Sequence, residues 1–501
     1  MKASTFQSDL VIASCYPLGT DQEVFKNLLF ENIKQFGYEP IEIRLSDIVR
    51  EFDFTNHLGE VAVAPPEARG SQNYAVALEL MEKGTALRKE WGRGDSLALL
   101  AVSEIAAKRE EIDEKTPVCF YIRSLKHTDE VKKLRSIYGP GFYIVGLHSE
   151  YTERRSHLIK DRAMEAHEAE SLIKKDQGEK EKLGQQTSKV FGVCDYFLWM
   201  GDRGEVRPQV SRFVDLLFGH PTITPTKSEY GMFLAFTASL RSADLSRQVG
   251  ASIFSRHGDI VSLGCNDVPR GGGGLYWPDD EYDAREWKRS YDSNDKEKRE
   301  IIAELLEVLA PEAKDSEDFL AKGFDLLKDT RLTDITEFGR IVHAEMDALL
   351  SAARVGVSVR GGRLYTTTFP CHNCAKHIIA AGISEIEYVE PYPKSLALKL
   401  HWDALELDKL LSPPSFIKEG EKLSDDRVKL VPFTGAAARR FTDFFSMGWS
   451  SGRQLERKAE GKAVEWSRSG LEPRVPMLPF SYLEKQDDAL DELKELKNDE
   501  S

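Results

Sequence analysis

The sequence lacks long hydrophobic segments and any excess of positive charge. None of its apolar runs approaches the ~18 consecutive residues that a membrane-spanning helix needs, so we expect no membrane association. The net charge of −15 argues against a wide basic surface for duplex nucleic acid, although a local basic pocket could still bind a smaller anion. The N-terminal residues 1–5 (Met-Lys-Ala-Ser-Thr) show no secretory signal pattern.

Cysteine is also scarce. Six cysteines occur in 501 residues, at positions 15, 119, 194, 265, 371 and 374. They are too few and too irregularly spaced for a disulfide framework, and only the last pair has the Cys-x-x-Cys spacing of a metal-binding turn. We therefore expect a cytoplasmic protein in a reducing compartment.

The length exceeds that of one ordinary domain, and 41% hydrophobic with 30% charged residues is typical of a globular protein. Changes in composition predict three segments, at 1–222, 223–450 and 451–501. The first two are expected to be α/β domains. The third is polar and ends in an acidic helix over 484–500, and we expect a solubilising or interaction tail with partial disorder.

The first segment alternates strand and helix patterns, which is typical of a parallel α/β sheet. Helices are expected over 22–36 and 205–218. The expected strands lie at 8–15, 40–45, 118–123, 142–147 and 196–200.

The loop after the first expected strand lies where a phosphate-binding P-loop would be. It contains Leu18, Gly19, Thr20 and Asp21. The full G-x-x-x-x-G-K-[ST] pattern is absent, because Ala13 stands at the first glycine position and no lysine precedes the threonine. The loop is therefore either a degenerate nucleotide-binding loop or a plain strand-to-helix turn.

Residues 121–147 begin Tyr-Ile-Arg-Ser-Leu-Lys-His and resemble P-loop nucleotide kinases of the dephospho-CoA and adenylate kinase kind. Residues 151–155 (Tyr-Thr-Glu-Arg-Arg) are similar to the start of their arginine-bearing lid helix. The resemblance covers roughly 8–220 and implies a P-loop kinase-like fold, with Arg123 and Arg154 as candidate phosphate contacts. Because the phosphate-pairing lysine is missing, we expect nucleotide sensing rather than phosphoryl transfer. A regulatory nucleotide or an inhibitory RNA would be the partner.

The second segment contains a metal-binding pattern. His343-Ala344-Glu345 is followed, after 24 residues, by Pro370-Cys371-His372-Asn373-Cys374. One imidazole and two thiols make a three-ligand site with a coordination position left open, which distinguishes catalytic from structural zinc. This arrangement is the signature of zinc-dependent deaminases. We predict Zn²⁺ as the cofactor, with His343, Cys371 and Cys374 as ligands and with His372 and His377 as unneeded neighbours.

Glu345 lies two residues from the ligand histidine and is the predicted catalytic residue. A carboxylate there can reach the attacking water without binding the metal itself. We expect Glu345 to take up the proton of that water and pass it to N3 of a cytosine ring, whose C4 gains oxygen and loses ammonia.

Further motifs narrow the family. Arg-Gln-Val-Gly-Ala at 247–251 precedes Asn-x-x-Pro-Arg-Gly at 266–271, and both precede the metal motifs. This order resembles the deoxycytidylate deaminase branch of the cytidine deaminase superfamily, which implies a three-layer α/β/α fold. In that family the asparagine of the Asn-x-x-Pro loop approaches the nucleotide, which implies substrate contact for Asn266, and we add Arg270 from the same loop. Members often carry Asn two positions after the glutamate; here Asp347 stands there and faces either the substrate or the helix interior.

Other features of this segment leave alternatives open. An expected hairpin covers 246–264, and the strand 386–390 places Lys394 at the ligand-facing edge of the sheet, as a candidate phosphate contact. An insertion over about 271–333 begins with four glycines, which either close over a ligand or form a mobile loop. Tyr276 and Trp277 could stack on a base or serve an interface or core.

The combined sequence prediction is hydrolytic deamination of dCTP or dCMP by a homo-oligomer. A kinase-like domain joined to a deoxycytidylate deaminase resembles the bacterial antiphage deaminases, which implies depletion of the dCTP pool as a defence. The alternatives are a polynucleotide cytidine or adenosine deaminase, which the acidic net charge disfavours, and a housekeeping dCMP deaminase. A nucleotide-sensing regulator with a structural zinc is a third class.

Overall fold

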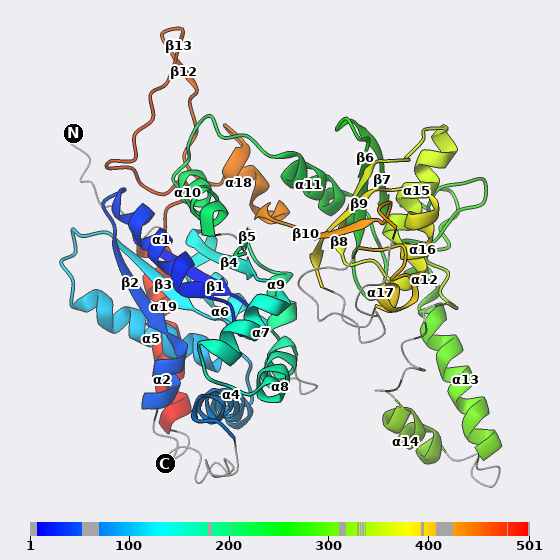
Figure 1. The fold of residues 1–501 in the computed structure, drawn as a ribbon, viewed down its shortest axis with the longest axis horizontal. Helices are drawn as coiled ribbons and strands as arrows, with labels where there is room; N and C mark the ends of the chain where they lie inside the picture. Colours follow the sequence, from blue (N-terminus) through cyan, green and yellow to red (C-terminus); the bar gives the residue numbers. More distant parts are fainter. Residues whose placement is uncertain are drawn as a thin grey trace. The chain divides into compact units, whose positions relative to one another are not determined.

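The computed structural model describes residues 8–52, 70–178, 183–201, 203–309, 317–327, 337–391, 395–406, 424–477 and 479–498, together with residues 330, 332 and 335. These residues form two compact units (Figure 1). The first unit contains the described residues up to Glu229 and from Pro432 onward. The second unit contains those from Tyr230 to Val431.

The first unit is built on a six-stranded sheet with the order β11-β5-β4-β1-β3-β2. The five strands expected from the sequence are present and parallel, and β11 (Gly435–Ala436) adds an antiparallel edge. They are β1 (Leu10–Cys15), β2 (Glu39–Arg44), β3 (Val118–Arg123), β4 (Phe142–His148) and β5 (Tyr196–Trp199). Every residue of β1 is buried, as expected for a central strand with neighbours on both sides. The predicted parallel sheet is thus confirmed.

Helices cover both faces of this sheet (Figure 1). On one face α1 (Gln22–Lys34) packs against α10 (Arg203–Leu217), and on the other α5 (Ser96–Glu110) packs against α6 (Thr128–Tyr138). The remaining helices of the unit are α2 (Leu45–Glu51), α4 (Gln72–Glu90), α7 (Tyr151–Lys160), α8 (Ala166–Gln177), α9 (Thr187–Phe191) and α18 (Phe441–Phe445).

The C-terminal residues correct two expectations. Residues from Pro432 onward return to the first unit, so the second domain does not continue to residue 450. The polar segment is not a detached tail, because α19 (Pro479–Asn498) packs against α5 and α6. Its buried side chains Tyr482, Ala489 and Leu493 alternate with charged residues at helical spacing, and this amphipathic pattern explains the docking. A small hairpin of β12 (Lys458–Ala459) and β13 (Lys462–Ala463) precedes it.

The second unit contains a five-stranded mixed sheet with the order β10-β9-β8-β6-β7. The hairpin expected over 246–264 is present as β6 and β7. β6 also pairs antiparallel with β8, and β8 pairs parallel with β9. The strands are β6 (Gly250–Phe254), β7 (Ile260–Cys265), β8 (Arg363–Thr368), β9 (Glu385–Glu390) and β10 (Lys429–Pro432).

Helices on both faces make the second unit a three-layer α/β/α arrangement, as expected. Gly250 of β6 faces α11 (Lys227–Ser239), where a Cβ would lie 1.9 Å from the Ala235 carbonyl oxygen. Gly264 of β7 faces the opposite helix, α15 (Ala344–Val355), with 2.3 Å to the Ala344 carbonyl oxygen. Both helices therefore approach the sheet more closely than a side chain would permit. α16 (His372–Ala380) packs beside α15.

The insertion forms further helices (Figure 1). They are α12 (Glu286–Arg289), α13 (Ser293–Leu309) and α14 (Glu317–Leu327), and α17 (Ala397–Leu400) follows β9. Within the ranges that the structure describes, no helix is both long enough and apolar enough to cross a membrane.

Candidate metal centre and active site

Two helix starts bring the metal-binding motifs together. His343 is the residue that precedes α15, and Cys371 is the residue that precedes α16, with Cys374 in its first turn. The Cys371 sulfur accepts a hydrogen bond from the Cys374 backbone amide at 3.4 Å. The positive end of the α16 dipole therefore lies at a thiolate.

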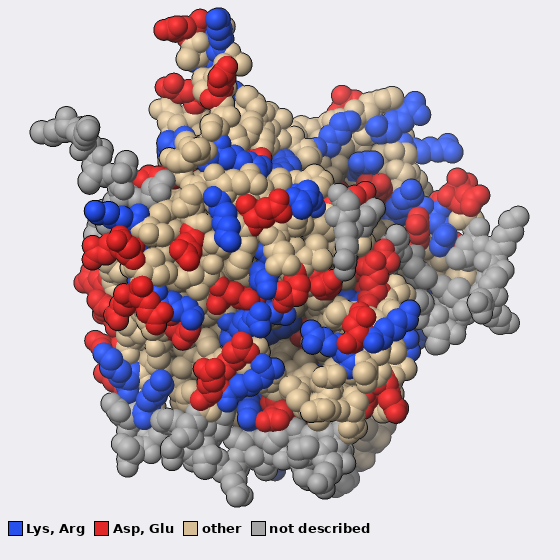
Figure 2. Space-filling view, turned by 60° about the vertical axis from the view of Figure 1, so that its left-hand side comes forward, with Lys and Arg blue, Asp and Glu red and all other residues tan. Residues whose placement is uncertain are grey.

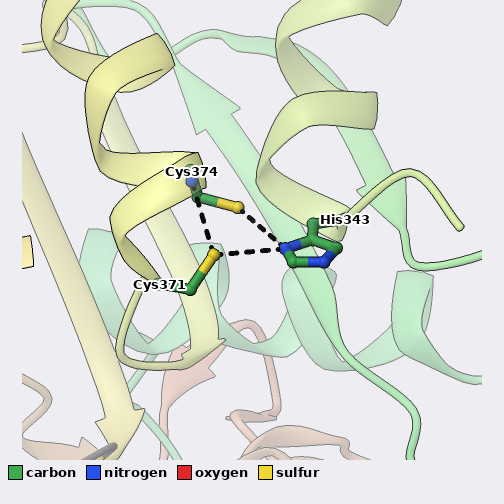
Figure 3. Close-up of side chains that lie close together, drawn as sticks. All are labelled: His343, Cys371 and Cys374. Carbon is green, nitrogen blue, oxygen red and sulfur yellow. Dashed lines mark hydrogen bonds between the residues drawn. The ribbon is translucent and has the colours of Figure 1, made fainter. Parts of the chain in front are cut away.

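The three side chains converge on one point (Figure 3). The Nδ1 atom of His343 lies 3.3 Å from the sulfur of Cys371 and 3.3 Å from that of Cys374. All three ligand atoms lie within 4.8 Å of one another. Among the described residues, no other group of three such side chains has this geometry. A nitrogen and two sulfurs at this spacing fit zinc.

The surroundings of the centre favour the deprotonated, metal-binding form of Cys371. A hydrogen bond from the Cys374 thiol, opposed by burial and helped by His343, lowers the pKa of Cys371 to about 4. The hydrogen bond with Cys371 raises the pKa of His343, against the opposing effect of burial. One sulfur is therefore a thiolate at neutral pH, the form in which cysteine binds metals.

Glu345 is buried beside these ligands, with 4% of its surface exposed. Its Oε2 accepts a hydrogen bond of 3.2 Å from the Cys374 sulfur. Burial, and then the negative charge of Cys371, raise the pKa of the Glu345 carboxyl. A carboxyl with a raised pKa next to a metal centre is suited to take up and release a proton.

A cavity of about 190 Å³ opens onto this centre, and His343, Glu345 and Cys371 all line it. The other walls come from the loop before β6, the end of β7, the insertion, the segment before α15 and the end of β8. These residues are Asp244, Ser246, Arg247, Val249, Asn266, Glu286, Asp292, Asn294, Gly339, Ile341, Ala344, Thr368 and Phe369.

Asn266, which the family resemblance implies as a substrate contact, lines this cavity. It is buried, and its side chain holds the segment before β6: its Oδ1 accepts from the Val249 amide at 2.7 Å and its Nδ2 donates to the Arg247 carbonyl at 2.9 Å. It thus shapes the cavity wall that carries Arg247.

Arg270 does not line the cavity; it is exposed and pairs with Asp280 at 2.7 Å. Lys394 lies outside the described residues. Trp277 stacks beneath Arg241 at 3.7 Å, and Tyr276 makes an edge contact with Tyr282. Neither aromatic ring lines the cavity.

Asp347, His372 and His377, which lie next to the metal ligands and Glu345 in the sequence, point away from the metal centre or lie at the surface. Asp347 is buried, accepts a hydrogen bond from the Cys265 amide at 3.3 Å and lies 3.7 Å from Arg354. It therefore packs against β7, which favours the interior alternative. His372 points to Glu337 at 3.3 Å, and His377 is exposed.

Sequence reasoning missed the part of the insertion that reaches the site. Glu286 and Asn294 line the cavity although they lie far from every motif in sequence. The charged pattern indicates the α13 helix, but no local pattern indicates which of its ends faces the metal. Arg247 was visible in the quoted motif and was not selected as a site residue.

In the first unit, the loop after β1 is held from within. The Leu18 amide donates to the Asp176 carboxylate at 2.8 Å, and the Thr20 hydroxyl donates to the Pro17 carbonyl at 2.7 Å. Gly19 has φ +88°, and a Cβ there would lie 2.6 Å from the Arg154 carbonyl oxygen. Asp21 precedes α1 without capping it through its side chain.

The two arginines of the first unit differ in position. Arg154 is buried, with its Nε donating to the Ser149 carbonyl at 3.2 Å, and this burial argues against contact with a ligand. Arg123 lines a separate cavity of the first unit together with Leu18, Gly19 and Thr20.

The three-layer fold and the histidine–dicysteine centre with an adjacent buried glutamate define a zinc-dependent hydrolytic deaminase site. Comparison with known families agrees: residues 225–390 match the cytidine and deoxycytidylate deaminase zinc-binding region. A deoxycytidylate deaminase of Enterobacteria phage T2 is 34% identical over 173 residues, which cover 34% of this chain and 81% of the phage protein. The chain belongs to the cytidine and deoxycytidylate deaminase family.

Two further similarities were found. A probable deoxycytidylate deaminase of Drosophila melanogaster is 31% identical over 161 residues, covering 32% of this chain and 58% of that protein. The chain thus spans little more than half of the fly relative. The crystal structure of a dCMP deaminase from the cyanophage S-TIM5 is 20% identical, with a TM-score of 0.21, and the match covers 36% of this chain and 94% of the cyanophage chain.

Proposed function

We propose that the protein deaminates dCMP to dUMP and ammonia in a zinc-dependent hydrolysis. The observation that carries the proposal is the shared cavity, which holds Glu345 beside two of the three metal-ligating side chains. Relatives named as deoxycytidylate deaminases support the choice of substrate.

His343, Cys371 and Cys374 would hold the zinc ion. Bound zinc would lower the pKa of a water molecule toward ~7 and so supply a nucleophile at neutral pH. Glu345 takes up the proton that the attacking water loses and delivers it to N3 of the cytosine ring. Glu345 then takes the second proton, from the hydroxyl group on C4, and passes it to the amino group, which leaves as ammonia while C4 becomes a carbonyl carbon. Because Glu345 is buried, its carboxyl does not exchange protons freely with solvent between these two transfers.

The charge of the cavity supports a substrate with one phosphate. Arg247 is the single cationic side chain among the described lining residues, whereas Asp244, Glu286 and Asp292 add carboxylates beside Glu345. A triphosphate brings more negative charge than one guanidinium balances, and repulsion from the carboxylates disfavours it. The charge of the cavity therefore favours dCMP over dCTP as the substrate, with Arg247 as the phosphate contact.

A polynucleotide substrate requires a basic groove with aromatic side chains for stacking. On the face drawn in Figure 2, basic and acidic side chains of the described residues alternate, and no broad basic surface is visible. The net charge of −15 also disfavours a nucleic-acid strand.

The test is an ammonia-release assay on the purified zinc-loaded protein with dCMP, dCTP, CMP, CTP and single-stranded DNA in parallel. We expect the fastest turnover with dCMP. Glu345→Ala should retain zinc and folding and lose activity. Turnover of the oligonucleotide alone, or an active Glu345→Ala protein, would contradict the proposal.

We also propose a role in antiphage defence, with activity that lowers the deoxycytidine nucleotide pool. Its support is the resemblance of a parallel α/β unit joined to a deaminase unit. The proposal further includes a cytoplasmic location, supported by six free cysteines, and a homo-oligomer. Nucleotide pools and phage plating on cells with wild-type or Glu345→Ala protein test the role, and light scattering tests the assembly.

A further inference from the structure

The first unit contains a cavity of about 510 Å³ that the proposed deaminase chemistry does not use. It lies at the carboxyl ends of β1, β2 and β3, between α2, α4 and the segment after α7. Ligands of open α/β sheets bind at this edge, and the volume falls within the ~300–1,000 Å³ of small-molecule sites.

The lining of this cavity contains more cationic than anionic side chains. Its lining contains six cationic side chains and three carboxylates, although the net charge of the chain is −15. The cations are Arg44, Arg50, Arg88, Arg123, Lys126 and Arg162, and the carboxylates are Glu23, Asp47 and Asp176. Five of these cations are paired with carboxylates, and Glu42 and Glu130 supply two of the partners from beside the lining. Arg162 is the lining cation that has no ion pair with a described residue, and its charge favours an anionic ligand.

Part of the lining is apolar. Val76, Ala77, Leu80 and Met81 of α4 and Leu97 of α5 make up this part. A ligand that fits both the cationic and the apolar part of the lining has an anionic group and an apolar body. The cavity floor contains Ser124, whose φ of +71° is unusual for a residue with a side chain and marks a backbone held in place by its surroundings.

In the loop after β1, the place where a phosphate-binding loop would hold a phosphate is occupied by a side chain of the protein itself. The Asp176 carboxylate, fully buried, accepts from the Leu18 amide at 2.8 Å and pairs with the Lys126 ammonium at 2.8 Å. The Thr187 hydroxyl adds a third contact at 3.3 Å. An amide and an ammonium at a strand-to-helix turn are the groups that bind phosphate in other proteins. Here an internal carboxylate takes the place of that anion.

The arginines on the other side of the cavity are arranged differently. Arg123 is held by Glu23 at 2.8 Å and by the Tyr16 hydroxyl at 3.1 Å, so its guanidinium is fixed in the cavity wall. The Arg162 guanidinium makes no hydrogen bond or ion pair with any described residue, and its backbone carbonyl is tied to Asn73 at 2.8 Å. Both guanidinium groups line the same cavity, and guanidinium groups bind phosphate through charge-assisted hydrogen bonds.

We propose that this cavity is a second nucleotide site, which binds a nucleoside monophosphate on Arg123 and Arg162 while Asp176 occupies the loop position of a further phosphate. The site binds without transferring a phosphoryl group. A nucleoside triphosphate is repelled by the Asp176 carboxylate and therefore binds more weakly than a monophosphate. A phosphate-binding loop has the opposite preference.

Isothermal titration of the full-length, zinc-loaded protein tests the proposal. Glu345→Gln in the background prevents turnover, so the result is independent of whether dCMP deamination is correct. The titrants are AMP, GMP, dTMP, adenosine, ribose 5-phosphate, ATP and a single-stranded RNA. We expect at least one nucleoside monophosphate to bind at one site per chain, and this binding should depend on Arg162. Its affinity should be higher than that of ATP, adenosine or ribose 5-phosphate.

Three variants locate the site. Arg162→Gln should lower the affinity for the monophosphate roughly tenfold or more, because it removes one hydrogen bond between charged groups. Arg155→Gln is the matched control, because Arg155 pairs with Glu170 on α7 and does not line the cavity. Asp176→Ala should strengthen ATP binding by a similar factor, because it vacates the phosphate position and leaves Lys126 without its carboxylate partner. Arg162 is exposed, so its replacement leaves folding intact.

Several outcomes would overturn the proposal. They are the absence of monophosphate binding below millimolar concentration, equal effects of Arg162→Gln and Arg155→Gln, and binding of the RNA but of no monophosphate. If monophosphate binding were lost in Arg247→Gln and not in Arg162→Gln, the binding would belong to the deaminase cavity.

Discussion

Replacement of Arg247 by glutamine provides a sharp test of the deaminase cavity. Arg247 lines the cavity from the loop before β6, and its backbone carbonyl is fixed by Asn266 at 2.9 Å. It is the single cation among the described lining residues. Glutamine retains a hydrogen-bonding group of similar reach and removes the charge. The variant should therefore bind the phosphate of dCMP less well and leave the metal centre unchanged.

The magnitude follows from the exposure of the side chain. A hydrogen bond to a charged group contributes about 1.5–3 kcal/mol, which corresponds to roughly 10–150-fold in affinity. Arg247 is exposed at the cavity rim, and solvent screening moves the expectation to the lower end, about tenfold in kcat/KM. The loss should appear mainly in KM, because the phosphate is remote from the reacting C4 atom. Higher salt should reduce the difference between the two proteins.

The assay compares kcat/KM for dCMP and for deoxycytidine, which has no phosphate. The variant should lose about tenfold with dCMP and show no change with deoxycytidine. Arg270→Gln is the matched control from a neighbouring loop, since Arg270 pairs with Asp280 outside the cavity. An equal loss with both substrates would refute a phosphate contact and would indicate an effect on the shape of the site.

Three further outcomes are expected. Cys371→Ser should lose most of its zinc, measured by elemental analysis against the wild type, because one of three ligands is removed. Gly19→Ala should destabilise the protein by about 1–3 kcal/mol in urea unfolding; Gly37→Ala, with φ +87° but open space around its Cβ position, should cost less. Leu493→Ala should cost about 2–4 kcal/mol and Leu483→Ala under about 0.5 kcal/mol, because 3% of the first and 45% of the second leucine is exposed on the same helix.

The sequence was sufficient for the chemistry of the metal centre. His343, Cys371 and Cys374 were identified from spacing, since a Cys-x-x-Cys turn places both sulfurs at one helix start without help from the rest of the fold. The parallel strands of the first unit and the hairpin of the second were also predicted, because their apolar patterns are local and nearly continuous. The adjacent glutamate followed from the same motif.

Contacts between distant segments were not predictable in this way. Asp176 reaches the loop after β1 across 158 positions, and Glu286 and Asn294 reach the metal cavity from an insertion with no motif. The docking of α19 on α5 and α6 and the separation of Arg270 from the cavity likewise depend on which surfaces meet. Local patterns determine the elements and the ligands that share one turn. Long-range packing determines which further side chains line a cavity, because burial and charge pairing are properties of the assembled fold.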